Sequence, residues 1–272
     1  MNAHTRSDEK VMCPVPGPRT AGTTAPSAPR VYNALLGGTD NSAADRALAA
    51  ELADPARGYP GVRELAEDNR KFILAAVTRL ASDGIRQFVD AGCGLPPGTM
   101  VHEAAGPGAR VAYVDHHPVV VSHMGARLHG HGGGLTAIRG DAGNPEAVLA
   151  DVQLRDIIDL CEPVAVLLGG TLSAMTAGAA RKAVAGFTAL LAAGSCVAVS
   201  CASYADRETG RRMQRAYRVA GEWWNHPPQD IRSFFAGLAM PYGPVTDAGS
   251  WPMLRDCGGK AALVLAGVGL KQ

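Results

Sequence analysis

The strongest chemical signal in the chain is a glycine-rich turn after a short apolar run. Residues 88–96 read Phe-Val-Asp-Ala-Gly-Cys-Gly-Leu-Pro, which places Asp90 and Ala91 just before Gly92 and Gly94. Glycine lets a backbone approach a ligand closely and adopt φ angles that other residues avoid. A carboxylate at a strand end can hold a polar or cationic group. We therefore expect a ligand-binding loop at this position.

Two further carboxylates follow the next two expected strands. Asp115, with His116 after it, ends the second strand, and Asp141, with Ala142 after it, follows the third. In an open α/β sheet, ligands bind beyond the carboxyl ends of the strands, where a carboxylate can accept both hydroxyls of a ribose. Asp141 could receive the amino group of an adenine. The three loops together predict a nucleoside site, and the alternative is that each carboxylate is an ordinary turn or N-cap residue.

The glycine-rich turn does not fit a dinucleotide. The fingerprint of such sites needs a third glycine three residues after the second, and this chain has Pro97 there. Asp90 would repel a pyrophosphate, whereas it would attract a sulfonium nucleoside that carries an ammonium group. The residues therefore favour S-adenosyl-L-methionine as cofactor and disfavour a nicotinamide-dependent oxidoreductase.

The composition is that of a chain with a sizeable folded core. Its 272 residues are 47% hydrophobic and 19% charged, which excludes a globally disordered chain and a disulfide-stabilised miniprotein. Basic and acidic residues nearly balance, at 26 against 25, so we expect no nucleic-acid or anionic-membrane partner. Glycine is in excess, at 33 residues without a collagen period, and must therefore serve local turns.

The sequence pattern indicates neither a signal peptide nor a membrane span. The six cysteines form no Cys-x-x-Cys pair, which indicates reduced cytosolic thiols and no metal site. Residues 1–29 have no apolar signal-peptide core, so we expect a flexible N-terminal arm and a cytoplasmic protein. An uncharged run over 183–205 is interrupted at Gly194, and we expect a helix followed by a buried strand rather than a membrane span.

Apolar periodicity predicts the elements that position these residues. Residues 30–82 are expected to form a helical cap, and residues 83–272 a Rossmann-like core. Short apolar runs alternate with helical stretches in the core, which predicts an α/β fold with a doubly wound, mostly parallel sheet. The expected helices are 31–36, 43–52, 62–82, 101–105, 118–128, stretches across 144–160, a helix ending at 193, 207–219 and 229–238. The expected strands are 85–89, 110–114, 135–139, 164–168, 196–201 and 261–268.

The segment from Arg30 to Arg46 carries a family resemblance. It reads RVYNALLGGTDN, then Ser42 and AADR, and resembles the RVYDYLLGGKDN-type opening of an actinobacterial family of S-adenosylmethionine-dependent methyltransferases, formerly a domain of unknown function. Similarity recurs at 69–72, 84–88, 94–96, 101–103, 111–115 and 234–238. It implies a single methyltransferase-like domain over 30–272, with a class I fold of seven strands, one of them antiparallel near the sheet edge.

Two segments depart from the family pattern. The family's Val-Asp-Asn-Asp-Pro is Val-Asp-His-His-Pro at 114–118, and residues 168–175 lack the family's His-Phe pair. The second segment usually lies beside the transferable methyl. Two alternatives therefore stay open: a cofactor-dependent cyclase, isomerase or rearrangement enzyme that does not methylate, and a non-catalytic nucleoside-binding regulatory module.

The expected function is methyl transfer to a small-molecule acceptor in bacterial specialised metabolism, by a protein that could be a homodimer. The cofactor-binding residues are expected to be Asp90, Ala91, Gly92, Gly94, Asp115, His116, Asp141, Ala142 and Gly169. The cap and substrate pocket are expected to include Tyr32, Gly38, Asp40, Asn41, Gly170, Thr171 and Trp223. The candidate catalytic residues are His102, Tyr32 and Tyr204, each with a structural role as the alternative.

Overall fold

A computed structural model of the chain describes residues 25–57, 59, 61–252 and 263–272. Its centre is a seven-stranded sheet with the strand order β3-β2-β1-β4-β5-β7-β6. The strands are β1 (Gln87–Ala91), β2 (Arg110–Asp115), β3 (Leu135–Arg139), β4 (Ala165–Gly169), β5 (Cys196–Ala202), β6 (Thr246–Asp247) and β7 (Val264–Leu270). The first five strands are parallel, and β7 runs antiparallel to β5 and β6. The expected fold class, including one antiparallel strand near the edge, is confirmed.

Helices cover both faces of this sheet. They are α1 (Ala28–Leu35), α2 (Ala43–Ala53), α3 (Val62–Ser82), α4 (Val101–Ala105), α5 (Pro118–Leu128), α6 (Pro145–Leu149), α7 (Val152–Arg155), α8 (Ala177–Leu190), α9 (Arg207–Tyr217) and α10 (Pro228–Ser233), with short 3-10 turns η1 (Pro55–Arg57), η2 (Thr171–Ala174) and η3 (Ala248–Ser250). One apolar core lies between the sheet and α3, α4 and α5, and a second between the sheet and α6, α7, α8 and α10. This arrangement buries strands that are apolar on both sides.

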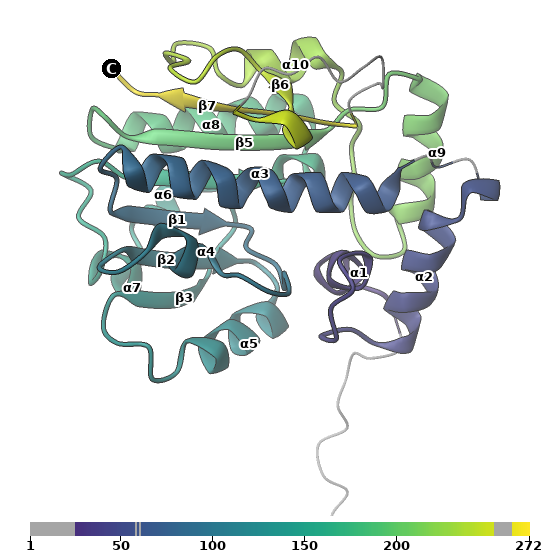
Figure 1. Cartoon of the computed structure of the whole chain (residues 1–272), viewed down its shortest axis with the longest axis horizontal. Helices are drawn as coiled ribbons and strands as arrows, with labels where there is room; N and C mark the ends of the chain where they lie inside the picture. The colour runs from purple at the N-terminus through teal and green to yellow at the C-terminus, as the bar shows by residue number, and fades with distance from the viewer. Residues whose placement is uncertain (1–24, 58, 60, 253–262) are drawn as a thin grey trace, which may run out of the picture.

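A third apolar cluster joins α1, α2, the start of α3 and α9. Figure 1 shows α1, α2 and α9 beyond the tip of β1, at the carboxyl end of the parallel strands. Leu52 and Val31 are fully buried in this cluster, and Val62 at the start of α3 is buried as well. The helical cap therefore packs at the carboxyl ends of the parallel strands, beside the acidic loops.

Two expected elements differ clearly from those observed, and one observed strand, β6, was not among the expected ranges. The first strand begins at Gln87 rather than residue 85, because Ile85 still closes the last turn of α3 through a hydrogen bond from its N–H to the Leu80 carbonyl (3.0 Å). Asp90 therefore lies within the strand. The expected helix at 229–238 is limited to Pro228–Ser233, and β6 has only two residues, too few for a detectable alternation.

The uncharged run at 183–205 divides between the end of α8 and β5. Within the described ranges, no helix is long and apolar enough to cross a membrane. Most of the expected arm, two of the six cysteines (Cys13 and Cys257) and the first residues of the expected strand at 261–268 lie outside the described residues.

Asp45 holds the start of the cap together. Its carboxylate accepts hydrogen bonds from Arg30 Nε (2.7 Å), from the Ser27 N–H (2.9 Å) and from Ser42, whose hydroxyl in turn caps α2. This capping box explains why the Ser-Ala-Ala-Asp sequence starts a helix. Burial would raise the pKa of Asp45, but the hydrogen bonds from Ser42, Arg30 and Ser27 outweigh it and lower the pKa below its ordinary value.

Asp45→Asn removes the charge that these donors bind. We expect the free energy of unfolding to fall by about 2–3 kcal/mol near neutral pH. Because the folded-state pKa is lowered, this stabilisation is present above roughly pH 4 and is lost as the pH falls through the folded-state value. Thermal denaturation of both proteins from neutral to strongly acidic pH checks the prediction. A difference in Tm that does not shrink in acid would contradict it.

Candidate functional site

A cavity of about 740 Å³ lies between the carboxyl ends of the parallel strands and the cap. Small-molecule sites typically enclose roughly 300–1,000 Å³. Strand-end residues of β1 to β5 line it on one side, and side chains of α1, α3 and α9 on the other. The predicted site residues that line it are Tyr32, Asp90, Gly92, Gly94, Asp115, His116, Asp141, Ala142, Gly169, Gly170, Thr171 and Trp223.

Asp90 lines this cavity with a carboxylate that has no hydrogen-bond partner in the part of the chain that the structure describes. The residue is 6% exposed, and its carboxylate has no hydrogen bond or ion pair among the described residues. Burial raises the pKa of Asp90 to about 6; the charge of Arg70 acts against the rise, and that of Asp115 adds to it. Burying a carboxylate without a partner is unfavourable. The group is therefore suited to a cation that enters the cavity.

Arg70 of α3 was not among the predicted site residues, yet it lines the same cavity. Its Nη2 donates to the Thr99 carbonyl, while its Nε is buried without a hydrogen-bond partner in the described part of the chain. An unpartnered guanidinium nitrogen and an unpartnered carboxylate in one cavity suit a zwitterion such as an amino acid. The sequence signal was weak, because the arginine follows Asn69 within an otherwise ordinary amphipathic helix.

Asp115 already organises the glycine-rich loop. Its two carboxylate oxygens accept hydrogen bonds from the N–H groups of Gly94 (3.0 Å) and His117 (2.8 Å). The Asp141 carboxylate accepts the Gly143 N–H (2.8 Å), as an ordinary turn residue does. Each oxygen keeps further lone pairs for a ligand. The loop after β1 is thus fixed by a carboxylate that also lines the cavity.

Gly92 lines the cavity and also leaves room for a neighbouring side chain. Its φ is +84°, and a side chain there would lie within 2.6 Å of Thr171 Cγ2. Thr171 Oγ1 donates to the Ala91 carbonyl (2.8 Å), so η2 packs directly on the end of β1. Gly94 also has a positive φ, +58°, but the space beside it is open. The loop after β1 is therefore constrained at Gly92 and accessible at Gly94.

Tyr32 reaches the cavity from α1 through a hydrogen-bonded chain. Asn69 Nδ2 donates to the Tyr32 hydroxyl (2.7 Å), and the hydroxyl donates to the Ala66 carbonyl (3.2 Å). Ser200 at the end of β5 donates to Asn69 Oδ1 (2.5 Å). Burial raises the pKa of Tyr32 to about 12, although the Asn69 hydrogen bond and Arg70 lower it. The phenol is therefore protonated near neutral pH and is poorly suited to act as a base.

The remaining predicted residues do not line the cavity; they are Ala91, Gly38, Asp40, Asn41, His102 and Tyr204. His102 Nδ1 is 2.8 Å from the Tyr113 hydroxyl, and burial lowers the pKa of the imidazole. The Tyr204 ring is buried behind Trp223, 6.1 Å between ring centroids, and burial raises the pKa of its phenol. His102 joins α4 to β2, and Tyr204 packs within the apolar cluster of the cap.

No group of three or more His, Cys, Asp or Glu side chains in residues 25–57, 59, 61–252 and 263–272 is placed to hold a metal ion.

His117, one of the departures from the family pattern, lines the cavity and caps α5 through its Nδ1, which accepts the Val119 N–H (3.3 Å). Burial lowers the pKa of His117.

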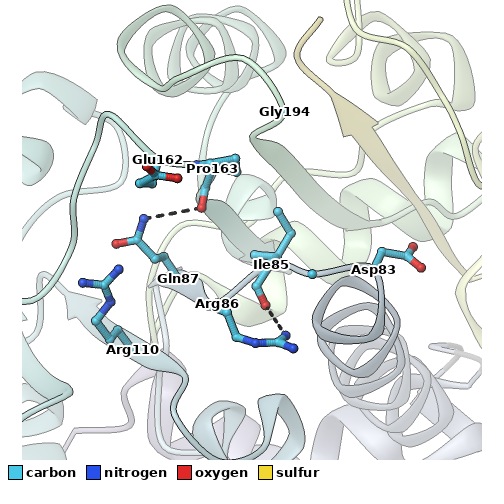
Figure 2. Close-up of a pocket in the computed structure, with 9 residues that line it drawn as sticks. Asp83, Ile85, Arg86, Gln87, Arg110, Glu162, Pro163 and Gly194 are labelled. Atoms are coloured by element: carbon cyan, nitrogen blue, oxygen red, sulfur yellow. Dashed lines mark hydrogen bonds between the residues drawn. The ribbon is translucent and has the colours of Figure 1, made fainter.

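A second cavity, of about 450 Å³, lies at the amino ends of the parallel strands, on the side of the sheet away from the first cavity. Figure 2 shows Gln87 directed at the Pro163 carbonyl and Arg86 at the Ile85 carbonyl. Gln87 also exchanges hydrogen bonds with the Asp159 backbone (2.8 and 2.7 Å). These side chains are already engaged in the fold, and none of the predicted site residues lies there.

The family model described as S-adenosyl methyltransferase matches residues 16–272. A methyltransferase candidate from Thermobifida fusca YX is 32% identical, with a TM-score of 0.84 over 91% of this chain and 96% of that one. A DUF574 family protein from Streptomyces avermitilis MA-4680 is 26% identical, with a TM-score of 0.81 over 92% and 99%. An O-methyltransferase family protein from Burkholderia thailandensis, 15% identical with a TM-score of 0.51 over 82% and 62%, shares the fold. No curated protein matches the chain.

Gly92→Ala and Gly94→Ala form a matched pair, because both glycines have positive φ angles but Gly92 also faces Thr171. We expect Gly94→Ala to lower the free energy of unfolding by about 1 kcal/mol and Gly92→Ala by about 3 kcal/mol or more. Denaturant titration of the two variants measures the difference. Equal losses would show that Thr171 moves aside at no cost.

Proposed function

The chain belongs to the S-adenosyl methyltransferase family and takes S-adenosylmethionine as cofactor, and on that premise we propose that it methylates a small-molecule acceptor in the cavity under α1. The buried, unpartnered carboxylate of Asp90 carries the proposal. A fold without a ligand would gain stability by replacing such a group. A cationic ligand accounts for its presence.

The residues of the cavity fit the cofactor in charge and order. In our proposal Asp90 holds the ammonium of the methionine end, and Arg70 holds its carboxylate. Asp115 at the end of β2 receives the ribose hydroxyls, with His116 beside it, and Ala142 lies against the adenine. Opposite charges in a partly dehydrated cavity interact more strongly than in water, so the two ends of the zwitterion would set the orientation of the molecule.

The bound cofactor supplies a methyl group that its positively charged sulfur already activates. The protein then has to align the acceptor and exclude water, and alignment alone can lower a barrier substantially. Tyr32 keeps its proton and its two hydrogen-bond partners, Asn69 and the Ala66 carbonyl. We therefore assign Tyr32 to shaping the acceptor site rather than to removing a proton.

Apart from the acidic loops, much of the cavity lining is apolar. The apolar residues include Leu35, Leu65, Met175, Met213 and Trp223. Such a surface suits a compact organic acceptor with an apolar body. A polynucleotide would need a positively charged track, which the near-neutral chain does not favour. A role in bacterial specialised metabolism is in keeping with an acceptor of this kind.

Asp90→Asn should change ligand affinity and the stability of the ligand-free protein in opposite directions. The variant should bind S-adenosylhomocysteine about 10- to 100-fold more weakly, because an ionic hydrogen bond is lost. It should also raise the Tm without ligand near neutral pH, because an unpaired buried charge is removed. The gain should shrink as the pH falls below about 6, where Asp90 is itself neutral. Calorimetry and thermal denaturation check both effects; a variant with unchanged affinity and a lower Tm would make Asp90 a structural residue.

The reaction itself is tested by incubating the protein with S-adenosylmethionine and a small-molecule extract of the producing cell. We expect S-adenosylhomocysteine to accumulate together with a product heavier by one methylene unit, and Asp90→Asn to suppress both. Mass spectrometry measures the two compounds. Product without S-adenosylhomocysteine would indicate a non-methylating catalyst, and cofactor binding without any turnover would indicate a regulatory module.

A further inference from the structure

Asn33 of α1 is fully buried and makes hydrogen bonds through both ends of its amide. Its Nδ2 donates to the Leu95 carbonyl (2.7 Å), and its Oδ1 accepts from Asn41 Nδ2 (2.7 Å). Leu95 belongs to the glycine-rich loop after β1, 62 residues further along the chain. One side chain of the cap is thus bound to the backbone of the loop that meets the proposed cofactor.

The Gly-Gly-Thr-Asp-Asn turn after α1 packs against the Asn33 amide and forms a hydrogen bond with it. The Gly38 N–H donates to the Asn33 carbonyl (2.9 Å), and a side chain at Gly38 would collide with the Asn33 amide. Asn41 Nδ2 also donates to the Gly38 carbonyl (2.7 Å), and Arg46 donates to Asn41 Oδ1 (2.9 Å). The turn motif therefore orients Asn33 although Gly38 and Asn41 do not line the cavity.

The loop that accepts the Asn33 hydrogen bond is also bound by a side chain at the end of β2. The Gly94 N–H donates to Asp115 Oδ2 (3.0 Å), and the next carbonyl, that of Leu95, receives Asn33. Two consecutive residues are thus fixed by β2 and by the cap, respectively. Gly94 has no side chain of its own, a positive φ and open space beside it, so its backbone depends on contacts made by other residues. The two hydrogen bonds supply the restraint that the glycine lacks.

We propose that Asn33 is a positioning residue for the cofactor, which orients the Gly94–Leu95 backbone so that the loop receives the methionine end. The proposal rests on the proposed function, since it assigns that end to the loop after β1. It also gives the turn motif a role at a distance: the motif acts on the cofactor through Asn33 and Leu95.

The experiment compares two ligands, because the loop would touch only one end of the cofactor. Asn33→Asp keeps the acceptor for Asn41 but loses the donor to Leu95. We expect it to weaken binding of S-adenosylhomocysteine about tenfold and to leave binding of adenosine, which lacks the methionine end, within about twofold. Asn41→Ala, which frees the Asn33 amide without touching the loop, should weaken S-adenosylhomocysteine about threefold. Calorimetry measures the affinity of the wild type and of each variant for both ligands.

Asp45→Asn is the matched control, because it weakens the cap at the Arg30 contact without touching the loop. It should lower the Tm and leave both affinities unchanged. The inference fails if Asn33→Asp binds S-adenosylhomocysteine like the wild type, if it weakens adenosine equally, or if Asp45→Asn has the same effect. If Asn33→Asp does not fold, Asn41→Ala takes its place: the inference then requires weaker binding of S-adenosylhomocysteine and unchanged binding of adenosine by that variant. Absence of S-adenosylhomocysteine binding to the wild type would instead overturn the proposed function.

Discussion

A carboxylate without a partner inside a folded protein raises the free energy of the native state, and the cavity is built around such a group. Asp90 sits within β1, whose backbone is paired with β2 on one side and β4 on the other. The strand cannot turn the side chain to solvent without breaking this pairing. Arg70 offsets part of the cost through its charge. The core of the sheet thus stabilises a site that is unfavourable by itself, which is common where a protein binds ligands.

The cap is held over this site by adjacent residues of one short helix. Tyr32 is connected through Asn69 to Ser200 at the end of β5, and Asn33 to Leu95 in the loop after β1. A helix of eight residues has little stability of its own, so its position depends on such contacts. Successive side chains on a helix point in directions about 100° apart. This geometry lets α1 contact both the end of β5 and the loop after β1.

The sequence predicted the succession of helices and strands along the chain well, because helical and strand periodicities were clear. The limits of α3, α4, α5 and β3 agree with those expected. It located Asp90 but not its place inside β1, since an apolar pattern does not distinguish Ile85 in a helix end from a strand residue. It missed Arg70, whose role depends on a neighbour 20 positions away that only the fold brings near. His102 illustrates the opposite error: its type suggested chemistry, but its partner Tyr113 engages it within the α4–β2 packing.

The contact between Thr171 and the end of β1 joins the two loops on which catalysis would depend. Thr171 donates to the Ala91 carbonyl, and Gly92 leaves room for its methyl group. A shift of one loop therefore has to move or break its contact with the other. If this contact couples the two occupants proposed for the cavity, the coupling is reciprocal: whatever factor the first ligand adds to the affinity of the second, the second adds to the first.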